Sequence, residues 1–279
     1  MAVKGIGVAV AGKWVAGASV ESAISRCAKL NERGVVGIIN YLGEEIRDAR
    51  KVDATKKVYI SIIERISKTG IRADISMKPT QLGLLLDFRT ALKNYLDVLD
   101  RAEKAGVFVW LDMEGHKFVS GTIKLYKEAA RYKNRGICIQ ACLKRSNGDL
   151  GRMRSDAIIR LVKGAHAEPH GASFTARSDI TRNYFDLMDR LFLRFKRFTI
   201  ATHDSGIIEH AIKLNKRYRR DVTYAMLLGI RNNMAYDMAK RGYSISIYVP
   251  FGQEWLPYAA RRLKEKQNAG LFLRSLISG

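Results

Sequence analysis

Short apolar runs rich in β-branched residues recur along the chain, and each is followed by a longer stretch with the periodicity of an amphipathic helix. Strands buried on both faces should be almost continuously apolar, and residues 136–141 and 244–249 fit this expectation. The pattern predicts strands at residues 35–40, 73–77, 107–112, 136–141, 158–163, 198–202, 223–228 and 244–249. Eight strands that alternate with helices are typical of a (β/α)₈ TIM-type barrel.

An open, doubly wound sheet is the alternative architecture. Gly5-Ile-Gly7 is not continued as GxGxxG, and no glycine-rich turn joins a strand to a helix as a dinucleotide fold requires. Before the first strand, Ser19 is positioned to cap a helix that ends near Gly34. We expect one barrel domain over residues 1–279.

Composition limits the class of protein. Hydrophobic residues make up 47% of the chain and charged residues 27%, which excludes a disordered or collagen-like chain. No apolar stretch is long enough for a membrane span, and we expect no signal peptide. Cys27, Cys138 and Cys142 lack metal-ligand spacing and are expected to be reduced thiols of a cytoplasmic protein.

The formal net charge of +22 would suit an anionic partner. Basic residues concentrate at positions 194–197 and 213–220, where aromatic side chains are interleaved with them. A solvated barrel exterior explains these clusters at least as well as a nucleic-acid groove does, so we do not expect nucleic acid as a partner.

Polar residues gather where the predicted strands end, and barrel active sites are built at that edge. The residues concerned are Lys78, Asp112, Glu114, Gln140, Lys163, His203, Asp204 and Tyr248. Arg160 differs because it lies inside a strand, where a buried guanidinium needs an anionic or hydrogen-bonding partner. Arg160 has two possible interpretations: it forms a structural ion pair with Asp112, or it has a role in the site.

After the last strand, residues 252–265 are predicted to form a further helix. Helical spacing brings Tyr258, Arg261, Arg262 and Glu265 close together. Paired guanidinium groups suit a carboxylate ligand, although a solvated basic helix face explains the same pattern.

Several motifs together resemble those of the proline dehydrogenase family. They are Arg160-Leu-Val-Lys-Gly-Ala165, Ala201-Thr-His203, Met226-Leu-Leu-Gly229, Tyr248-Val-Pro-Phe-Gly252 and Tyr258-Ala-Ala-Arg-Arg-Leu263. Val15-Ala-Gly17, Tyr41-Leu-Gly-Glu44, Ser76-Met-Lys-Pro-Thr80, Leu111-Asp-Met-Glu114 and Gln140-Ala-Cys-Leu-Lys-Arg145 agree in family order. The resemblance spans nearly the whole chain.

The resemblance implies a distorted (β/α)₈ barrel with an N-terminal helix and an extra C-terminal substrate-binding helix. It implies FAD as cofactor and hydride transfer from L-proline to flavin N5, giving Δ1-pyrroline-5-carboxylate. The implied catalytic residues are Lys78, Asp112 and Arg160, with Lys78 and Asp112 as a charged pair and Arg160 beside flavin N5. The implied substrate-binding residues are Lys78, Leu227, Tyr248, Tyr258, Arg261 and Arg262. The implied cofactor-binding residues are Gln140, Arg160, Val162, Lys163, Gly164, Ala165, His166, Thr202, His203 and Glu265.

Two positions depart from the family pattern. His166 stands where the family usually has tyrosine, and Ala225 stands where glutamine is expected. His166 and His170 have the spacing of a metal pair, but Pro169 between them argues against one helical face, and we expect no metal. The resemblance at Tyr258 favours proline over hydroxyproline.

The resemblance also implies partners. Electrons would pass to quinone, and a separate pyrroline-5-carboxylate (glutamate semialdehyde) dehydrogenase would use the product. The charge of the chain would suit peripheral docking on an anionic membrane surface, at the inner face of the membrane. Two other readings of the residues stay open: a barrel-fold lyase that uses Lys78 and Lys163, and a basic RNA- or lipid-binding protein without activity.

Overall fold

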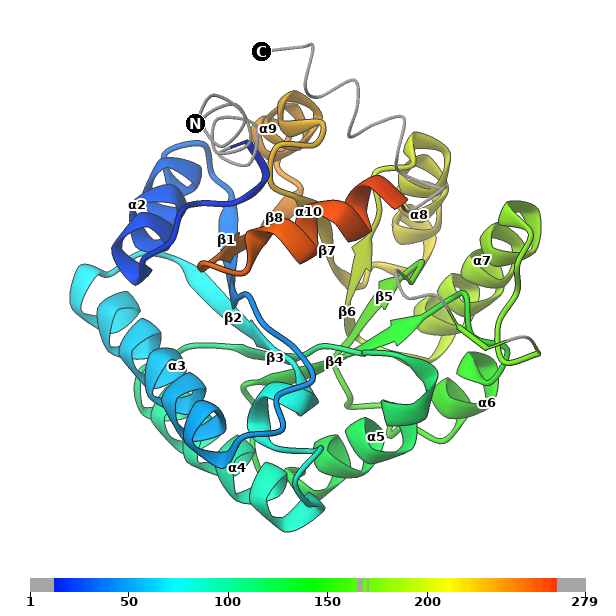
Figure 1. The fold of residues 1–279 in the computed structure, drawn as a ribbon. Helices are drawn as coiled ribbons and strands as arrows, with labels where there is room; N and C mark the ends of the chain where they lie inside the picture. The colour runs from blue at the N-terminus through cyan, green and yellow to red at the C-terminus, as the bar shows by residue number, and fades with distance from the viewer. Residues whose placement is uncertain (1–12, 165–167, 170, 265–279) are drawn as a thin grey trace.

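Eight parallel strands close into a barrel in the order in which they occur along the chain, with helices around it (Figure 1). This computed structural model describes residues 13–164, 168–169 and 171–264, and for 261–264 the backbone alone. The strands are β1 (Val36–Tyr41), β2 (Ala73–Met77), β3 (Val109–Leu111), β4 (Arg135–Gln140), β5 (Ile159–Val162), β6 (Arg197–Ala201), β7 (Asp221–Leu227) and β8 (Ser244–Phe251). The predicted (β/α)₈ barrel is confirmed, and every predicted strand boundary lies within two residues of the observed one.

Helices connect successive strands on the outside of the barrel. They are α3 (Ala49–Thr69), α4 (Phe88–Lys104), α5 (Val119–Glu128), α6 (Ser146–Gly151), α7 (Arg177–Arg194), α8 (Ser205–Tyr218) and α9 (Asn232–Lys240). Short 3₁₀ turns, η1 (Pro79–Leu82) and η2 (His116–Phe118), follow β2 and β3. Asp48, Asp87 and Asp204 cap α3, α4 and α8 by accepting backbone N–H bonds, which satisfies donors that a helix start leaves unpaired.

Two helices distort the regular barrel pattern. Helix α2 (Val20–Asn31) precedes the barrel, packs against both β1 and β8, and begins with the predicted Ser19 cap. Helix α10 (Trp255–Lys264) follows β8 but lies across the barrel opening instead of beside the sheet (Figure 1). Its Tyr258 and Ala259 pack in a separate apolar cluster with Leu42 and Ile230, which follow β1 and β7. The helix after β8 therefore covers the carboxyl end of the barrel.

The barrel interior carries polar side chains where bulky aliphatic residues usually dominate. Ser76 and Trp110 are register partners on β2 and β3, and Cys138 and Arg160 are partners on β4 and β5. Gly136 lies beside Trp110, and a Cβ atom at Gly136 would stand 2.4 Å from the indole. The missing side chain of Gly136 therefore leaves room for the Trp110 ring.

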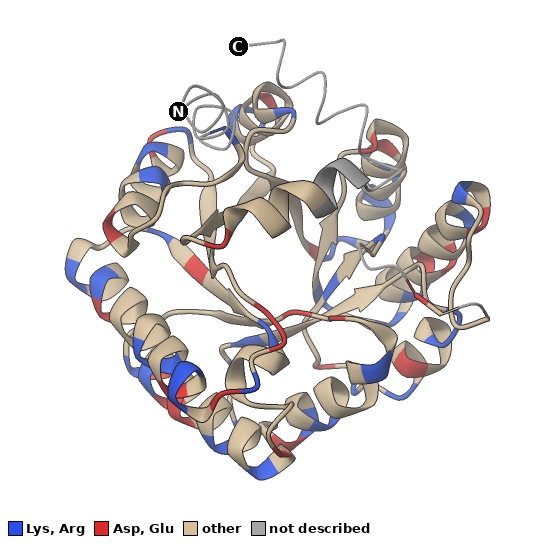
Figure 2. Cartoon of the chain, viewed as in Figure 1, with Lys and Arg blue, Asp and Glu red and all other residues tan. Residues whose placement is uncertain are grey.

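The basic clusters lie away from the barrel opening. Residues 194–197 form the end of α7 and the start of β6, and residues 213–220 form the end of α8 before β7. Both segments precede strands, so they belong to the amino-terminal end of the barrel. Lys and Arg residues are also spread along the outer helices (Figure 2). Within the described residues, none of the helices has the length and apolar character needed to span a bilayer.

We predict that Gly136→Ala destabilises the protein by about 1–3 kcal/mol, because the added methyl group would overpack the barrel against Trp110 and the Ile158 carbonyl oxygen. Urea unfolding followed by circular dichroism measures this change. Gly151→Ala in α6 is the matched control, since its Cβ would meet no atom within 4 Å. Equal stability of the two variants would contradict the packing argument.

Candidate active site

A deep cavity opens at the carboxyl end of the barrel, beneath α10. It encloses about 1120 Å³ of space, its opening to solvent included. Its wall is formed by Ile38, Glu44, Lys78, Asp112, Met113, Cys138, Gln140, Arg160, Val162, Lys163, Gly164, Ala201, Thr202, His203, Ala225, Met226, Leu227, Tyr248 and Tyr258. This size and mixed lining are typical of a site for a cofactor or substrate.

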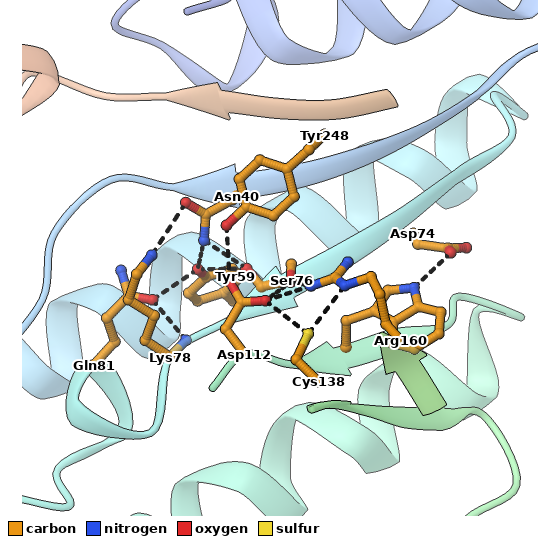
Figure 3. Close-up of polar contacts among 11 residues, drawn as sticks. Asn40, Tyr59, Asp74, Ser76, Lys78, Gln81, Asp112, Cys138, Arg160 and Tyr248 are labelled. Carbon is orange, nitrogen blue, oxygen red and sulfur yellow. Dashed lines mark hydrogen bonds and ion pairs between the residues drawn. The ribbon is translucent and has the colours of Figure 1, made fainter. Parts of the chain in front are cut away.

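Asp112 is the centre of a buried hydrogen-bond network at the bottom of the cavity (Figure 3). Its Oδ1 accepts from Ser76 Oγ at 2.8 Å and from the Arg160 guanidinium. Its Oδ2 accepts from the Tyr248 hydroxyl at 2.8 Å. Because strands β2, β5 and β8 and the residue that follows β3 supply these groups, the network ties opposite sides of the barrel together.

Arg160 is the ion-pair partner of Asp112 and is only 3% exposed. Nη2 also donates to Ser76 Oγ at 2.9 Å, and Nε donates to Cys138 Sγ at 3.0 Å. The guanidinium carbon lies 4.8 Å from the centre of the Trp110 ring. Nη1 is buried without a hydrogen-bond partner among the described residues. Arg160 lines the cavity, and buried donors of this kind are usually paired with protein, water or a ligand.

The ion pair determines the charge state of both partners. Burial acts to raise the pKa of Asp112, but the positive charges of Arg160 and Lys78, with bonds from Tyr248 and Ser76, outweigh it and lower that pKa. Burial acts to lower the pKa of Arg160, yet Cys138, Asp112 and Tyr248 raise it overall. Asp112 is therefore a carboxylate and Arg160 a permanent cation in the folded protein.

Lys78 occupies the other side of Asp112 (Figure 3). The resemblance implied a charged Lys78–Asp112 pair, and among the described residues the ion pair of Asp112 is with Arg160. Lys78 Nζ lies 3.5 Å from Asn40 Oδ1 and acts on Asp112 through its charge. Gln81 Oε1 accepts the Lys78 backbone N–H at 3.0 Å and holds the start of η1. Lys78 and Asp112 therefore interact through their charges, while Arg160 makes the ion pair with Asp112.

Glu114 is a second buried carboxyl group near the rim. It accepts from the backbone N–H of Thr80 at 2.9 Å and from the Thr80 hydroxyl at 2.6 Å. Burial raises its pKa from 4.5 to about 7, and the Thr80 bonds and Lys78 only partly oppose this. Glu114 therefore changes protonation near neutral pH.

The wall formed by β5, β6 and β7 is more polar at its edge. Lys163 Nζ donates to Asp204 Oδ2 at 3.1 Å, and His203 Nε2 accepts the backbone N–H of Leu227 at 3.2 Å. A backbone N–H donates to Nε2 only when that nitrogen carries no proton, so His203 presents Nε2 as an acceptor. Gly164 has φ +105°, and a Cβ there would stand 2.2 Å from Cys142 Sγ. The chain can follow this path only with glycine.

The structure brings most of the expected site residues into one cavity. Those that line it are Lys78, Asp112, Gln140, Arg160, Val162, Lys163, Gly164, Thr202, His203, Leu227, Tyr248 and Tyr258. Arg261 and Arg262 lie in α10, but their side chains are outside the described part of the structure. Ala165, His166 and Glu265 lie outside the described residues altogether.

Sequence reasoning missed several groups that hold the site together. Asn40 and Tyr59 bond to the Ser76 carbonyl oxygen, at 2.9 Å each. Cys138 was interpreted only as a buried thiol, yet it lines the cavity and contacts Arg160. The available signal was strand alternation, because Asn40, Ser76 and Cys138 are polar positions that point into the barrel beside the expected site residues.

Comparisons with known proteins identify relatives of this chain. The model of the family described as proline dehydrogenase matches residues 23–275. Proline dehydrogenase 2 of Bacillus subtilis (strain 168) is 30% identical over 261 residues, 92% of this chain and 86% of that protein. The proline dehydrogenase of Deinococcus radiodurans is 30% identical over 283 residues, 97% of this chain and 91% of that protein.

Solved structures resemble the fold. Proline utilization A from Bdellovibrio bacteriovorus, inactivated by N-propargylglycine, superposes with a TM-score of 0.87 at 20% identity. The match covers 98% of this chain and 34% of that much longer protein. This likeness shows the barrel fold alone, and this chain spans about a third of that protein.

We predict strong coupling between Asp112 and Arg160 in a double-mutant cycle. Asp112→Asn or Arg160→Met alone should each cost about 3–5 kcal/mol of unfolding free energy, because each leaves a buried charge or donor set without its partner. The double variant should cost clearly less than the two changes added together. Urea unfolding at pH 7 measures all four corners. The exposed pair Lys57–Asp53 is the control, and its coupling should be much smaller than that of the buried pair, because solvent screens exposed charges.

A second prediction concerns Glu114. Its pKa is higher in the folded protein than in the unfolded chain, so its protonation stabilises the fold fully below about pH 4.5, and this stability is lost as pH rises through about 7. Glu114→Gln should remove on the order of 3 kcal/mol of pH dependence between pH 4.5 and 8. Unfolding free energies across this range test it, with exposed Glu128→Gln as control. A profile of Glu114→Gln parallel to that of the wild type would refute the assignment.

Proposed function

This chain belongs to the proline dehydrogenase family, and we propose that it oxidises L-proline to Δ1-pyrroline-5-carboxylate with FAD as cofactor. The observation that carries the proposal is the buried Nη1 of Arg160, a residue of the cavity wall, which has no hydrogen-bond partner in the described part of the chain. A permanently charged donor without an acceptor is costly inside a barrel unless a bound group completes it. When bound, the flavin would supply the acceptor for the hydride.

The residues of the cavity fit such a cofactor. Arg160 presents a cation that would favour a reduced, negatively charged ring system. The glycine at Gly164 allows a ligand to approach the backbone closely, and the neighbouring Gln140 and Val162 supply further wall. His203 and Lys163 stand on the adjacent strand ends, and we assign them to the cofactor side together with Thr202.

The opposite side of the cavity suits proline. Tyr248, Tyr258 and Leu227 offer apolar surface for the ring of the substrate. Arg261 and Arg262 of α10 would bind its carboxylate, because guanidinium forks match carboxylate geometry. In this assignment α10, which lies across the barrel opening, is a substrate-binding helix.

Charge in the cavity favours the reactive form of the amine. Only an unprotonated proline nitrogen can release electrons toward the departing hydride. Lys78, Arg160 and Lys163 place three cations at the cavity wall, and among the described residues Arg160 pairs with Asp112 and Lys163 with Asp204, so a further cation at the substrate amine would be disfavoured. We therefore assign to Lys78 and Asp112 the role of setting the charge that the amine experiences.

The proposal extends to partners. Quinone would take up the electrons, and a separate pyrroline-5-carboxylate dehydrogenase would consume the product. Residues 1–279 would act as one catalytic domain in the cytoplasm. The basic charge of the chain supports peripheral docking on an anionic membrane surface, where quinone is dissolved.

Absorption spectroscopy of the purified protein tests the function. We expect a flavin spectrum that bleaches when L-proline is added without oxygen. Arg262→Met should keep the flavin but raise the proline concentration for half-bleaching at least ten-fold, because a charge-assisted bond is lost. A colourless protein that binds no added FAD would contradict the proposal and favour a lyase. A yellow protein that proline does not reduce would contradict proline as the substrate.

A further inference from the structure

The Arg160 guanidinium has five N–H donors, and their partners define its orientation. Nη2 donates to Ser76 of β2 and to Asp112, which follows β3, and these two residues also bond to each other. The Nε contact is to Cys138 on β4, at 3.0 Å. Nη1 has no partner among the described residues. A planar group held along two adjacent edges presents its third edge in one direction.

Cys138 contacts both members of the Arg160–Asp112 ion pair. Its Sγ accepts from Arg160 Nε and also donates to Asp112 Oδ1 at 3.5 Å. Cys138 and Arg160 are register partners on neighbouring strands, so the backbone fixes the distance between the two side chains. The thiol is 3% exposed and belongs to the cavity wall.

The Cys138 thiol can orient the Arg160 guanidinium without neutralising its charge. Burial raises the pKa of Cys138 to about 12, although Arg160 opposes this shift, so the thiol stays neutral at physiological pH. A neutral sulfur accepts a hydrogen bond from Nε but leaves the charge of the guanidinium in place. A second carboxylate at this position would instead cancel the positive charge at the cavity wall.

We propose that Cys138 is a positioning residue, whose sulfur holds Arg160 Nε so that the unpartnered Nη1 edge faces the cavity. Through Arg160 it sets the strength of the interaction with the bound redox cofactor, and this part of the inference rests on the proposed function. Without the sulfur acceptor, the guanidinium keeps its pair with Asp112 but loses the constraint on rotation about that pair. The cofactor would then experience a weaker and less directed positive charge.

The first experiment measures the two-electron reduction potential of the bound flavin in Cys138→Ala, Cys138→Ser and the control Cys27→Ala. Cys27 is a buried thiol of α2, packed against Gly37 outside the barrel. Cys138→Ala should lower the potential by at least about 30 mV, which is a ten-fold change for a two-electron couple. Cys138→Ser should recover part of the loss, because its hydroxyl oxygen is also an acceptor. Cys27→Ala should match the wild type.

A second experiment needs no flavin. A double-mutant cycle of Cys138→Ala with Arg160→Met in urea unfolding should give a coupling of at least about five-fold in the unfolding equilibrium constant, as expected for contacting residues. Cys27→Ala with Arg160→Met should give none. If Arg160→Met does not fold, Arg160→Lys replaces it, because lysine keeps the charge but has no Nε donor.

The outcomes separate the inference from the proposed function. A protein that takes up no flavin contradicts the proposed function, and the coupling alone then decides whether Cys138 holds Arg160. A wild-type potential in a folded, flavin-containing Cys138→Ala variant would overturn the positioning role. So would an equal shift in Cys27→Ala, since that would indicate a general effect of losing a buried thiol.

Discussion

A buried ion pair between Arg160 and Asp112 is the constraint around which the barrel interior is arranged. Removing two charges from water is costly, and the attraction between them compensates only when their remaining donors and acceptors are also satisfied. Ser76, Cys138 and Tyr248 meet that need from three further strands. This explains why short polar side chains occupy positions that branched aliphatic residues fill in most barrels of this kind. Arg160 Nη1 is left without a hydrogen-bond partner among the described residues, and Arg160 is part of the cavity wall.

The positions of helices α2 and α10 determine how the cavity is covered. Helix α2 packs on β1 and β8, on the flank that a regular barrel covers with its last helix, and this leaves α10 to lie over the carboxyl end. Tyr258 and Ala259 attach α10 to the loops after β1 and β7 through an apolar cluster that is separate from the main core. A small cluster of this kind can open with less loss of buried surface than a core helix can. The position of α10 over the barrel opening is therefore both the distortion of the fold and the feature that controls access to the site.

The sequence allowed the barrel to be predicted because its signal is local. Each strand is a short apolar run, and each lies beside its chain neighbour, so the order of strands follows from the order of runs. Residues at strand ends, such as Lys163 and His203, could be expected in the site for the same reason. The Arg160–Asp112 pair was one of two open readings, because spacing along the chain does not show which residues face each other across 48 positions. The displacement of Lys78 from Asp112 and the contact of Cys138 with Arg160 depend on side-chain packing, which periodicity cannot resolve.

The balance of charge in the cavity follows from these contacts and limits what can bind there. Asp112 is ionised, and its two oxygens accept hydrogen bonds from Arg160, Ser76 and Tyr248. Lys78 lies beside Asp112 but has no carboxylate in ion-pair contact among the described residues. Burial raises the pKa of Glu114, the other buried carboxyl group near Lys78, to about 7. Glu114 is therefore only partly ionised at neutral pH and compensates only part of the positive charge of Lys78. The described part of the wall carries the basic residues Lys78, Arg160 and Lys163 against the carboxyl groups of Glu44 and Asp112, so it is positive on balance. A ligand that carries a carboxylate and a neutral amine suits such a wall better than one with a protonated amine. This preference arises from the burial of Glu114 and the orientation of Asp112, and a simple count of charged residues along the chain would not have revealed it.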